Sequence, residues 1–300
     1  MRSIRLKEHV PNTVKVRVPD EGEFAGYNGT IENKEYVLKI DGNGFVASRH
    51  AGKLKDARKV VLLGDSFFEC AFVDDGKRVA DICNKMSLRK EGGVNFINAG
   101  YAAATAMNSF MSYAAKIMPL RPNAVYFSAD TFDVSCWQDE RSYWMPHPWF
   151  STTLPADRNY RARRGPSSGK EDFEAILEGL FAMCRQSNTK LVLITKPICP
   201  ESAWSASRQK YYEAKTSALR EYNDVVRSYC NRKNRLLLDI DADCKLEWDD
   251  FYDANHLNQK GARKVARAIY SYETKKKAAE KPSSGLLRRF WFNRSRTGPA

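Results

Sequence analysis

Short aliphatic runs alternate with longer stretches of helical periodicity from about residue 58 onward. Each run is β-branched or leucine-rich and ends on polar or glycine residues, as a strand buried on both faces does. The runs are Val60–Leu63, Val94–Asn98, Ala124–Phe127, Leu191–Thr195 and Leu236–Ile240. Helical periodicity lies between and after them, over residues 76–88, 104–118, 171–187, 207–231 and 258–272. This alternation predicts a three-layer α/β/α fold with a five-stranded parallel sheet.

Three segments do not follow the alternation. Residues 1–57 are polar and irregular, with short strand-like pieces at Val14–Val18 and Tyr36–Ile40, and are interpreted as an N-terminal extension. The main domain is assigned to residues 58–274, with a long insertion at 134–168 that is rich in aromatic residues. Its rings could stack on sugars or form a small satellite core, and both interpretations stay open. Residues 275–300 are interpreted as a flexible basic tail.

The net charge of +13 is concentrated in that tail. Residues 275–300 hold eight basic residues against Glu280 alone, so they contribute +7 and leave +6 for the other 274 residues. No docking element surrounds these cations, and we therefore expect no nucleic-acid partner. The aromatic cluster Phe290–Phe292 lies between arginines, which leaves open a peripheral contact of residues 286–296 with an anionic membrane surface.

Seven widely spaced cysteines without a C-x-x-C pair predict neither a disulfide framework nor a zinc site. No run approaches the ~18 apolar residues of a membrane-spanning helix, and no signal-peptide pattern is present. We therefore expect a cytoplasmic protein, with the inner membrane as the surface that the tail could touch. A glycine-rich phosphate loop is also missing, and no metal or organic cofactor is expected.

Polar residues follow the predicted strands, where ligands collect in an open parallel sheet. Ser66 comes directly after the first strand and Gly100 after the second. Asp253 and His256 form an Asp-x-x-His sequence before the last helix, for which Asn258 is a good N-cap. A serine nucleophile needs a base, and the base needs an orienting acceptor. The plainer alternatives are a capping serine, a helix-cap histidine paired with its aspartate, and a turn glycine.

Over residues 58–272 the chain resembles the SGNH/GDSL hydrolase family. The resemblance rests on Gly64-Asp65-Ser66, on the glycine after the second strand, and on Asp253-x-x-His256-Leu-Asn-x-x-Gly. It implies a flavodoxin-like fold, Ser66 as nucleophile, His256 as base and Asp253 as the residue that orients the imidazole. It also implies an oxyanion hole built from the N–H groups of Ser66 and Gly100. The implied activity is a serine esterase that deacylates, most simply deacetylates, a carbohydrate or small ester.

After the third strand the chain departs from the family pattern, in which the Asn of Gly-x-Asn-Asp donates to the oxyanion. Aligned on Asp133 the Asn position holds Phe132, and aligned on Ser128 it holds Asp130, neither of which restores the donor. The Thr131 hydroxyl is a third candidate. This departure keeps two alternatives open: an O-acyltransferase of bacterial polysaccharide modification, and a catalytically silent relative that binds a glycan or partner. Carboxylates near these positions, including Glu69, are interpreted as structural or capping groups.

Overall fold

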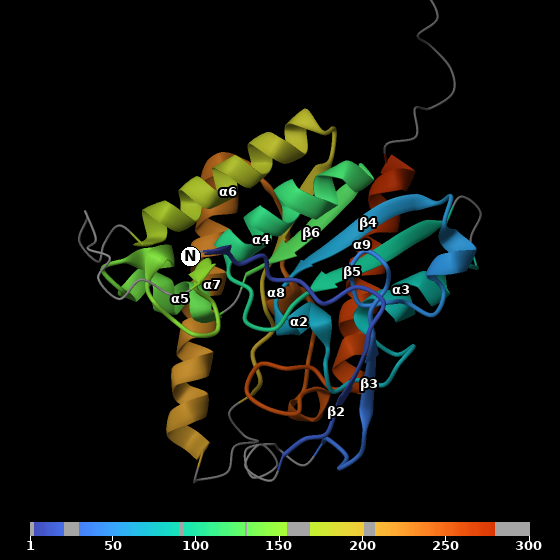
Figure 1. Cartoon of the computed structure of the whole chain (residues 1–300), viewed down its shortest axis with the longest axis horizontal. Coiled ribbons are helices and arrows are strands. Elements are labelled where there is room, and N and C mark those ends of the chain that lie inside the picture. Colours follow the sequence, from blue (N-terminus) through green and yellow to red (C-terminus); the bar gives the residue numbers. More distant parts are fainter. Residues whose placement is uncertain are drawn as a thin grey trace, which may run out of the picture.

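The computed structural model describes residues 3–20, 30–89, 93–129, 131–154, 169–200 and 208–279. At its centre is a twisted parallel sheet of five strands (Figure 1). These are β4 (Arg58–Gly64), β5 (Val94–Gly100), β6 (Ala124–Ser128), β8 (Lys190–Ile194) and β9 (Leu236–Leu238). Their order, β5-β4-β6-β8-β9, is the flavodoxin-like order of doubly wound folds. The predicted fold class is therefore confirmed.

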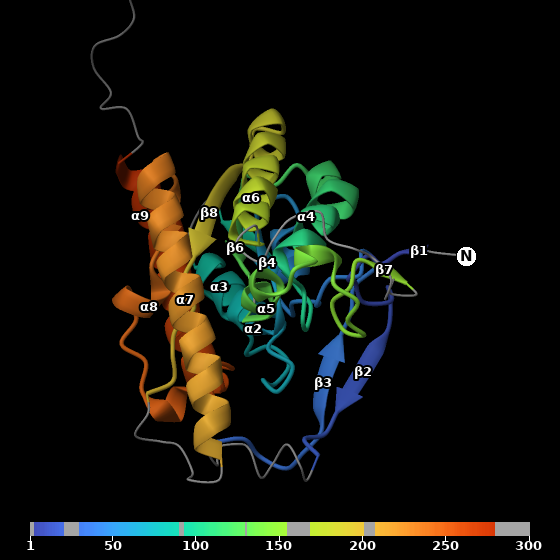
Figure 2. The same ribbon diagram turned by 90° about the vertical axis from the view of Figure 1, so that its left-hand side faces the viewer.

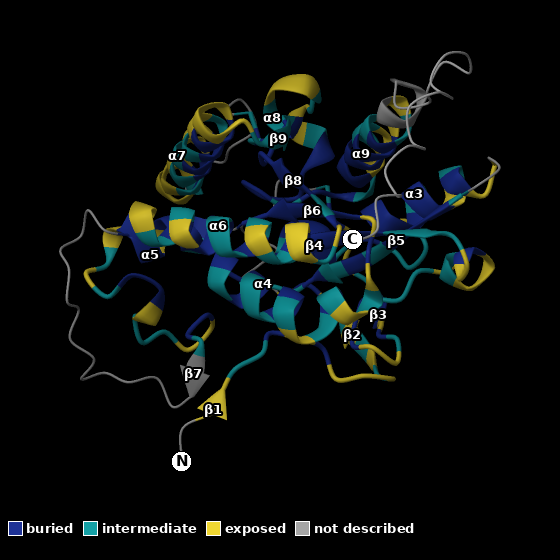
Figure 3. Cartoon of the chain, turned by 90° about the horizontal axis from the view of Figure 1, so that it is seen from above, coloured by how far each residue is buried: buried dark blue, intermediate teal, exposed yellow. Residues whose placement is uncertain are grey.

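Helices cover both faces of the sheet, with α3 and α9 on one side and α4 and α6 on the other (Figure 3). Their bounds are α3 (Val79–Ser87), α4 (Ala106–Ser112), α6 (Gly169–Gln186), α7 (Gln209–Lys233) and α9 (Gln259–Ala279). Val60 and Leu62 of β4 pack with α3 and α9, whereas Val61 and Leu63 pack in the cluster that holds α4, α6 and α7. Successive residues of one strand thus enter two different cores, which explains the uninterrupted aliphatic runs.

The helical stretches predicted from periodicity are present, with somewhat different ends. The stretch at 104–118 is α4 followed by a π-helical turn, Tyr113–Ile117, and a short 3-10 turn, Met118–Leu120. Three further helices have no counterpart in the sequence pattern. These are α2 (Ser66–Glu69), α5 (Thr131–Gln138) and α8 (Ile240–Asp243). The first of them begins at the candidate nucleophile itself.

The N-terminal residues border the sheet through several short pairings. The strand-like pieces predicted there are β2 (Val14–Arg17) and β3 (Tyr36–Lys39), which form an antiparallel hairpin. A short 3-10 helix, Ala51–Leu54, precedes β4. β1 (Ser3–Ile4) pairs with β7 (Thr153–Leu154) of the insertion. Figure 2 shows the hairpin and one end of α7 extending beyond the sheet on either side of α2.

The aromatic insertion divides between the core and the surface. Trp137, Tyr143 and Phe150 are buried in the core cluster that contains β6 residues, so this part extends the main core. Trp144 and Trp149 are exposed, the latter by 61%. Residues 155–168 lie outside the described part of the chain.

Helix α9 continues to Ala279, so the first residues assigned to the tail are helical. Residues 280–300, with the 286–296 segment considered for membrane contact, lie outside the described residues. Within the described ranges, no helix is long and apolar enough to cross a membrane.

Candidate active site

A cleft with a volume of about 880 Å³ opens where β4 and β5 end. Parallel pairing brings these ends together, because Gly64 lies opposite Gly100 on one side and Ser128 on the other. The cleft is lined by Ser66 after β4, by residues 101–103 after β5, by α7 and by the loop that precedes α9. Arg17 of the β2–β3 hairpin also lines it. The candidate residues predicted from strand ends therefore gather at one edge of the sheet, as expected.

The turn from β4 into α2 fixes the position of Ser66. Asp65 caps the helix, with its Oδ1 accepting a hydrogen bond from the Phe67 N–H at 2.9 Å. Its other oxygen, Oδ2, forms an ion pair with the ammonium of Lys196, and both side chains are almost fully buried. Lys196 comes shortly after β8, so it too lies beyond the carboxyl end of a strand, where site residues are expected. Only Ser66 of this turn remains partly exposed toward the cleft.

Three side chains from two distant parts of the chain form one hydrogen-bonded series. His256 Nδ1 lies 2.6 Å from Asp253 Oδ2, and His256 Nε2 lies 2.8 Å from Ser66 Oγ. A carboxylate only accepts, so Nδ1 carries the proton and Nε2 accepts the hydrogen bond that the Ser66 hydroxyl donates. The structure thus brings together the residues that the sequence singled out, with the histidine tautomer that a general base requires.

The loop before α9 holds the imidazole in place. Asp253 Oδ1 accepts hydrogen bonds from the backbone N–H groups of Asn255 at 2.9 Å and His256 at 2.8 Å. Burial alone would raise the pKa of Asp253, but the nearby His256 and these hydrogen bonds outweigh it and lower the pKa. The Tyr252 ring stacks on the imidazole, with centroids 5.3 Å apart and planes 8° from parallel. Asn258 caps α9, because its Oδ1 accepts from the N–H of Lys260 and of Gly261.

The structure corrects the expected role of Gly100. Its N–H donates to Asn98 Oδ1 at 3.0 Å, and Gly100 does not line the cleft. A Cβ at this position would lie 2.3 Å from the Glu69 backbone nitrogen, so the glycine is needed for close packing of α2 against β5.

The turn that follows β5 supplies a different candidate donor for the oxyanion hole, the N–H of Ala103. Ala103 lines the cleft together with Ser66, and its φ of 56° is in the left-handed region. Within the described part of the chain, neither the Ser66 N–H nor the Ala103 N–H has a hydrogen-bond acceptor. Sequence reasoning misses Ala103, because an alanine carries no sign that its backbone will adopt a positive φ.

Among the described residues after β6, no side-chain donor is seen beside Ser66. Thr131 Oγ1 accepts a hydrogen bond from Lys215 Nζ at 3.2 Å, and Thr131 does not line the cleft. Phe132 does line it, through an aromatic ring. Asp133 is fully buried and accepts from the Ala106 N–H at 2.8 Å, the capping role expected for it. Asp130 lies outside the described residues.

A buried acid lies one helical turn after Ser66. Glu69 lines the cleft, and its Oε1 lies 3.3 Å from both Arg17 Nη2 and His9 Nε2. Burial raises the pKa of Glu69. Burial, together with the nearby charges of Lys15 and Arg17, lowers the pKa of His9 to about 4. These contacts tie the N-terminal segment to α2 beside the cleft.

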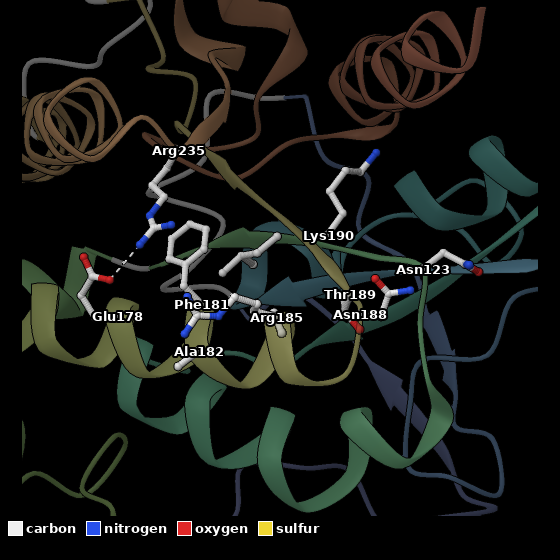
Figure 4. Close-up of a pocket in the computed structure, with 11 residues that line it drawn as sticks. Asn123, Glu178, Phe181, Ala182, Arg185, Asn188, Thr189, Lys190 and Arg235 are labelled. Carbon is white, nitrogen blue, oxygen red and sulfur yellow. Dashed lines mark hydrogen bonds and ion pairs between the residues drawn. The ribbon is translucent and has the colours of Figure 1, made fainter. Parts of the chain in front are cut away.

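A second cavity, of about 500 Å³, lies at the opposite end of the sheet (Figure 4). Asn123 immediately before β6 and Lys190 at the start of β8 line it, with the Glu178–Arg235 ion pair at 2.9 Å. Neither serine nor histidine is among its lining residues. Among the described residues, no group of three or more His, Cys, Asp or Glu is placed to hold a metal ion.

Solved structures similar to this chain include an acetyl xylan esterase, with TM-score 0.49 and 15% identity over 71% of this chain and 98% of that one. A catalytic mutant of an acetylxylan esterase from Geobacillus stearothermophilus gives 0.48 and 16%, over 71% and 92%. A lipase/acylhydrolase from Enterococcus faecalis gives 0.46 and 18%, over 76% and 100%. No family model and no curated protein matches the chain.

Proposed function

We propose that the chain is a serine esterase of the SGNH/GDSL type, which removes acetyl or other short acyl groups from a carbohydrate or small ester. The observation that carries the proposal is the hydrogen-bonded series Ser66–His256–Asp253 at the edge of an open cleft. A serine that merely caps a helix does not need a histidine at 2.8 Å, nor a carboxylate that fixes that histidine's tautomer.

In this mechanism His256 Nε2 accepts the hydroxyl proton as Ser66 Oγ attacks the ester carbonyl. The imidazolium then forms beside the Asp253 carboxylate, which stabilises it, and gives its proton to the departing alcohol. Water attacks the resulting acyl-serine while His256 accepts one of its protons, and the carboxylic acid leaves. Ser66 regains its proton from His256. These steps use no metal or organic cofactor.

Negative charge develops on the carbonyl oxygen during both attacks. The N–H groups of Ser66 and Ala103 are the donors that we assign to this oxygen, because both residues line the cleft. One such donor is worth roughly 10²–10³ in rate, so two backbone donors support catalysis without the side-chain amide that is missing after β6.

Hydrolysis of p-nitrophenyl acetate by the wild type and by Ser66→Ala tests the proposal. We expect turnover by the wild type only, and labelling of Ser66 by a fluorophosphonate probe. Equal turnover by both proteins would remove Ser66 from the mechanism. A wild type that neither turns over nor accepts the probe would support the silent, binding relative.

The second candidate is an O-acyltransferase with the same triad, in which a sugar hydroxyl takes the place of water. Phe132 and Trp149 both line the cleft, with ring centroids 6.3 Å apart, and offer a surface on which an acceptor sugar could stack. Incubation with an acyl donor and a glycan, followed by mass spectrometry, separates the two reactions. Acylated glycan supports transfer, and free acid without acylated glycan supports hydrolysis.

A further inference from the structure

The cleft carries more basic than acidic side chains. Five of the described residues that line it are basic: Arg5, Lys7, Arg17, Arg208 and Lys215. Three are acidic, and two of these have partners inside the cleft, since Asp253 is bound to His256 and Glu69 contacts Arg17. The third, Asp20, is exposed. A positive excess therefore surrounds the proposed nucleophile.

Among the described residues, two of these cations form hydrogen bonds with neutral acceptors. Arg5 Nη1 donates to the Pro148 carbonyl oxygen at 2.6 Å, and Lys215 Nζ donates to Thr131 Oγ1 at 3.2 Å. Neither forms an ion pair with any residue in the described part of the chain. Outside the cleft the pattern differs, as in the pairs Lys170–Glu221 at 2.7 Å and Lys260–Asp249 at 2.6 Å.

The two cations flank an aromatic surface. Lys215 Nζ lies 4.9 Å from the centre of the Phe132 ring, and Phe132 packs edge-to-face against Trp149. Arg5 contacts the carbonyl of residue 148, directly before Trp149 in the chain. We call these four residues, Arg5, Phe132, Trp149 and Lys215, the basic aromatic wall. Trp149 is 61% exposed, so its ring is available to a ligand.

A neutral sugar and an anionic sugar would differ in their free energy of binding to this wall. Either could stack on the rings, but a bound sugar also displaces water from the guanidinium and the ammonium, which costs free energy unless a charge replaces that water. A carboxylate or phosphate group supplies that charge and forms strong, charge-assisted hydrogen bonds with Arg and Lys.

We propose that the substrate of this site is an anionic saccharide ester, whose sugar ring stacks on Phe132 and Trp149 and whose carboxylate or phosphate binds Arg5 and Lys215. The proposal rests on the esterase function for turnover, but binding to the wall can be measured without it. It names a substrate class that the triad alone does not select.

The kinetic test compares kcat/KM for an O-acetylated oligouronate, an O-acetylated sugar phosphate and an O-acetylated xylo-oligosaccharide. We expect at least one anionic substrate to exceed the neutral one by about tenfold or more, and the excess to shrink at high salt. The two anionic arms distinguish a carboxylate from a phosphate. Equal values for all three substrates would overturn the proposal.

Arg5→Gln and Lys215→Gln should reduce the anionic-to-neutral ratio toward one, mainly through KM, and Lys215→Arg should restore most of it. Lys170→Gln is the matched control, because Lys170 pairs with Glu221 and does not line the cleft. An unchanged ratio in both glutamine variants would contradict the proposal.

Calorimetric titration of the Ser66→Ala protein with the deacetylated oligouronate and sugar phosphate measures binding independently of turnover. Binding of either anion that weakens in Lys215→Gln supports the wall even if no ester is cleaved. If neither anion binds while the wild type still hydrolyses p-nitrophenyl acetate, the wall is refuted and the esterase function stays intact.

Discussion

Lys196 and Asp65 form an ion pair that is almost completely buried, one residue before the proposed nucleophile. Asp65 uses its other oxygen to cap α2, so each carboxylate oxygen has a partner within the fold. Removing one partner of a buried pair leaves an uncompensated charge, which costs more than the pair itself contributes. The backbone of the nucleophile turn therefore depends on a lysine in the segment that follows β8.

Lys196→Met keeps most of the length of the side chain but leaves the Asp65 carboxylate without its ammonium. We expect the free energy of unfolding to fall by about 3–5 kcal/mol, with a parallel loss of esterase activity. Urea denaturation monitored by fluorescence gives the value. In the double variant Asp65→Asn/Lys196→Met, part of the loss should be recovered because no charge remains buried. A single variant within about 0.5 kcal/mol of the wild type would show that the pair is dispensable.

Asp253→Asn should reduce kcat by roughly 10³–10⁴, because an amide group can donate to Nδ1 and stabilise the wrong histidine tautomer. Stopped-flow or steady-state hydrolysis of p-nitrophenyl acetate measures the loss. Asp249→Asn serves as the control, since Asp249 lies on the surface and pairs with Lys260. A similar loss in both variants would indicate a general effect on folding.

Substitutions at Gly100 and Ala103 should have different effects on the free energy of unfolding. Gly100→Ala places a Cβ 2.3 Å from the Glu69 nitrogen and 2.7 Å from the Phe68 carbonyl carbon, both backbone atoms. We expect a loss of about 1–3 kcal/mol in unfolding free energy. Ala103→Gly relieves a positive φ, and its unfolding free energy should equal that of the wild type or exceed it by up to about 1 kcal/mol. Thermal and urea unfolding of the two variants test both expectations. A Gly100→Ala protein more stable than Ala103→Gly would contradict the packing role of Gly100.

His9 should make stability depend on pH. Its pKa is lowered from 6.5 to about 4 in the folded protein, so between these values the unfolded chain binds a proton that the folded chain does not. The free energy of unfolding therefore falls as the pH falls from 6.5 to about 4, by up to about 3 kcal/mol.

The comparison with His9→Gln isolates this contribution, because Glu69 and the other carboxylates titrate in both proteins. Urea unfolding at pH 7.5, 6, 5 and 4.5 should show the wild type losing stability relative to the variant. Parallel pH profiles would mean that His9 keeps its ordinary titration in the fold.

The sheet could be predicted because β4, β6 and β8 are buried over most of their length and appear in the sequence as apolar runs. The juxtaposition of Ser66, Asp253 and His256 could be predicted because strand ends meet at one edge of the sheet and because Asp253 and His256 lie within one turn. Their distance from Ser66 in the chain does not matter once the sheet order is known.

Other features leave no such pattern. Helix α2 is only four residues long, too short to show a period. Buried positions of α5 include Asp133, Val134 and Cys136, which are consecutive or nearly so, and its polar and apolar residues do not separate onto two faces. Gly100 was expected to donate to an oxyanion, but close packing of two backbones explains this glycine. The basic aromatic wall joins residues from the N-terminal segment, the insertion and α7, and this juxtaposition depends on tertiary structure alone.

The pairing of β1 with β7 has a practical consequence for producing the protein. Among the described residues, Ser3 and Ile4 pair with the insertion, and Arg5 adds hydrogen bonds from its N–H to the Thr152 carbonyl at 2.8 Å and from its guanidinium to the Pro148 carbonyl at 2.6 Å. Arg5 and Lys7 line the cleft, so an affinity tag fused ahead of this strand would lie close to the cleft and could pull the strand away. Purification through a cleavable tag at the other end of the chain avoids this disturbance and preserves the cations whose contribution is to be measured.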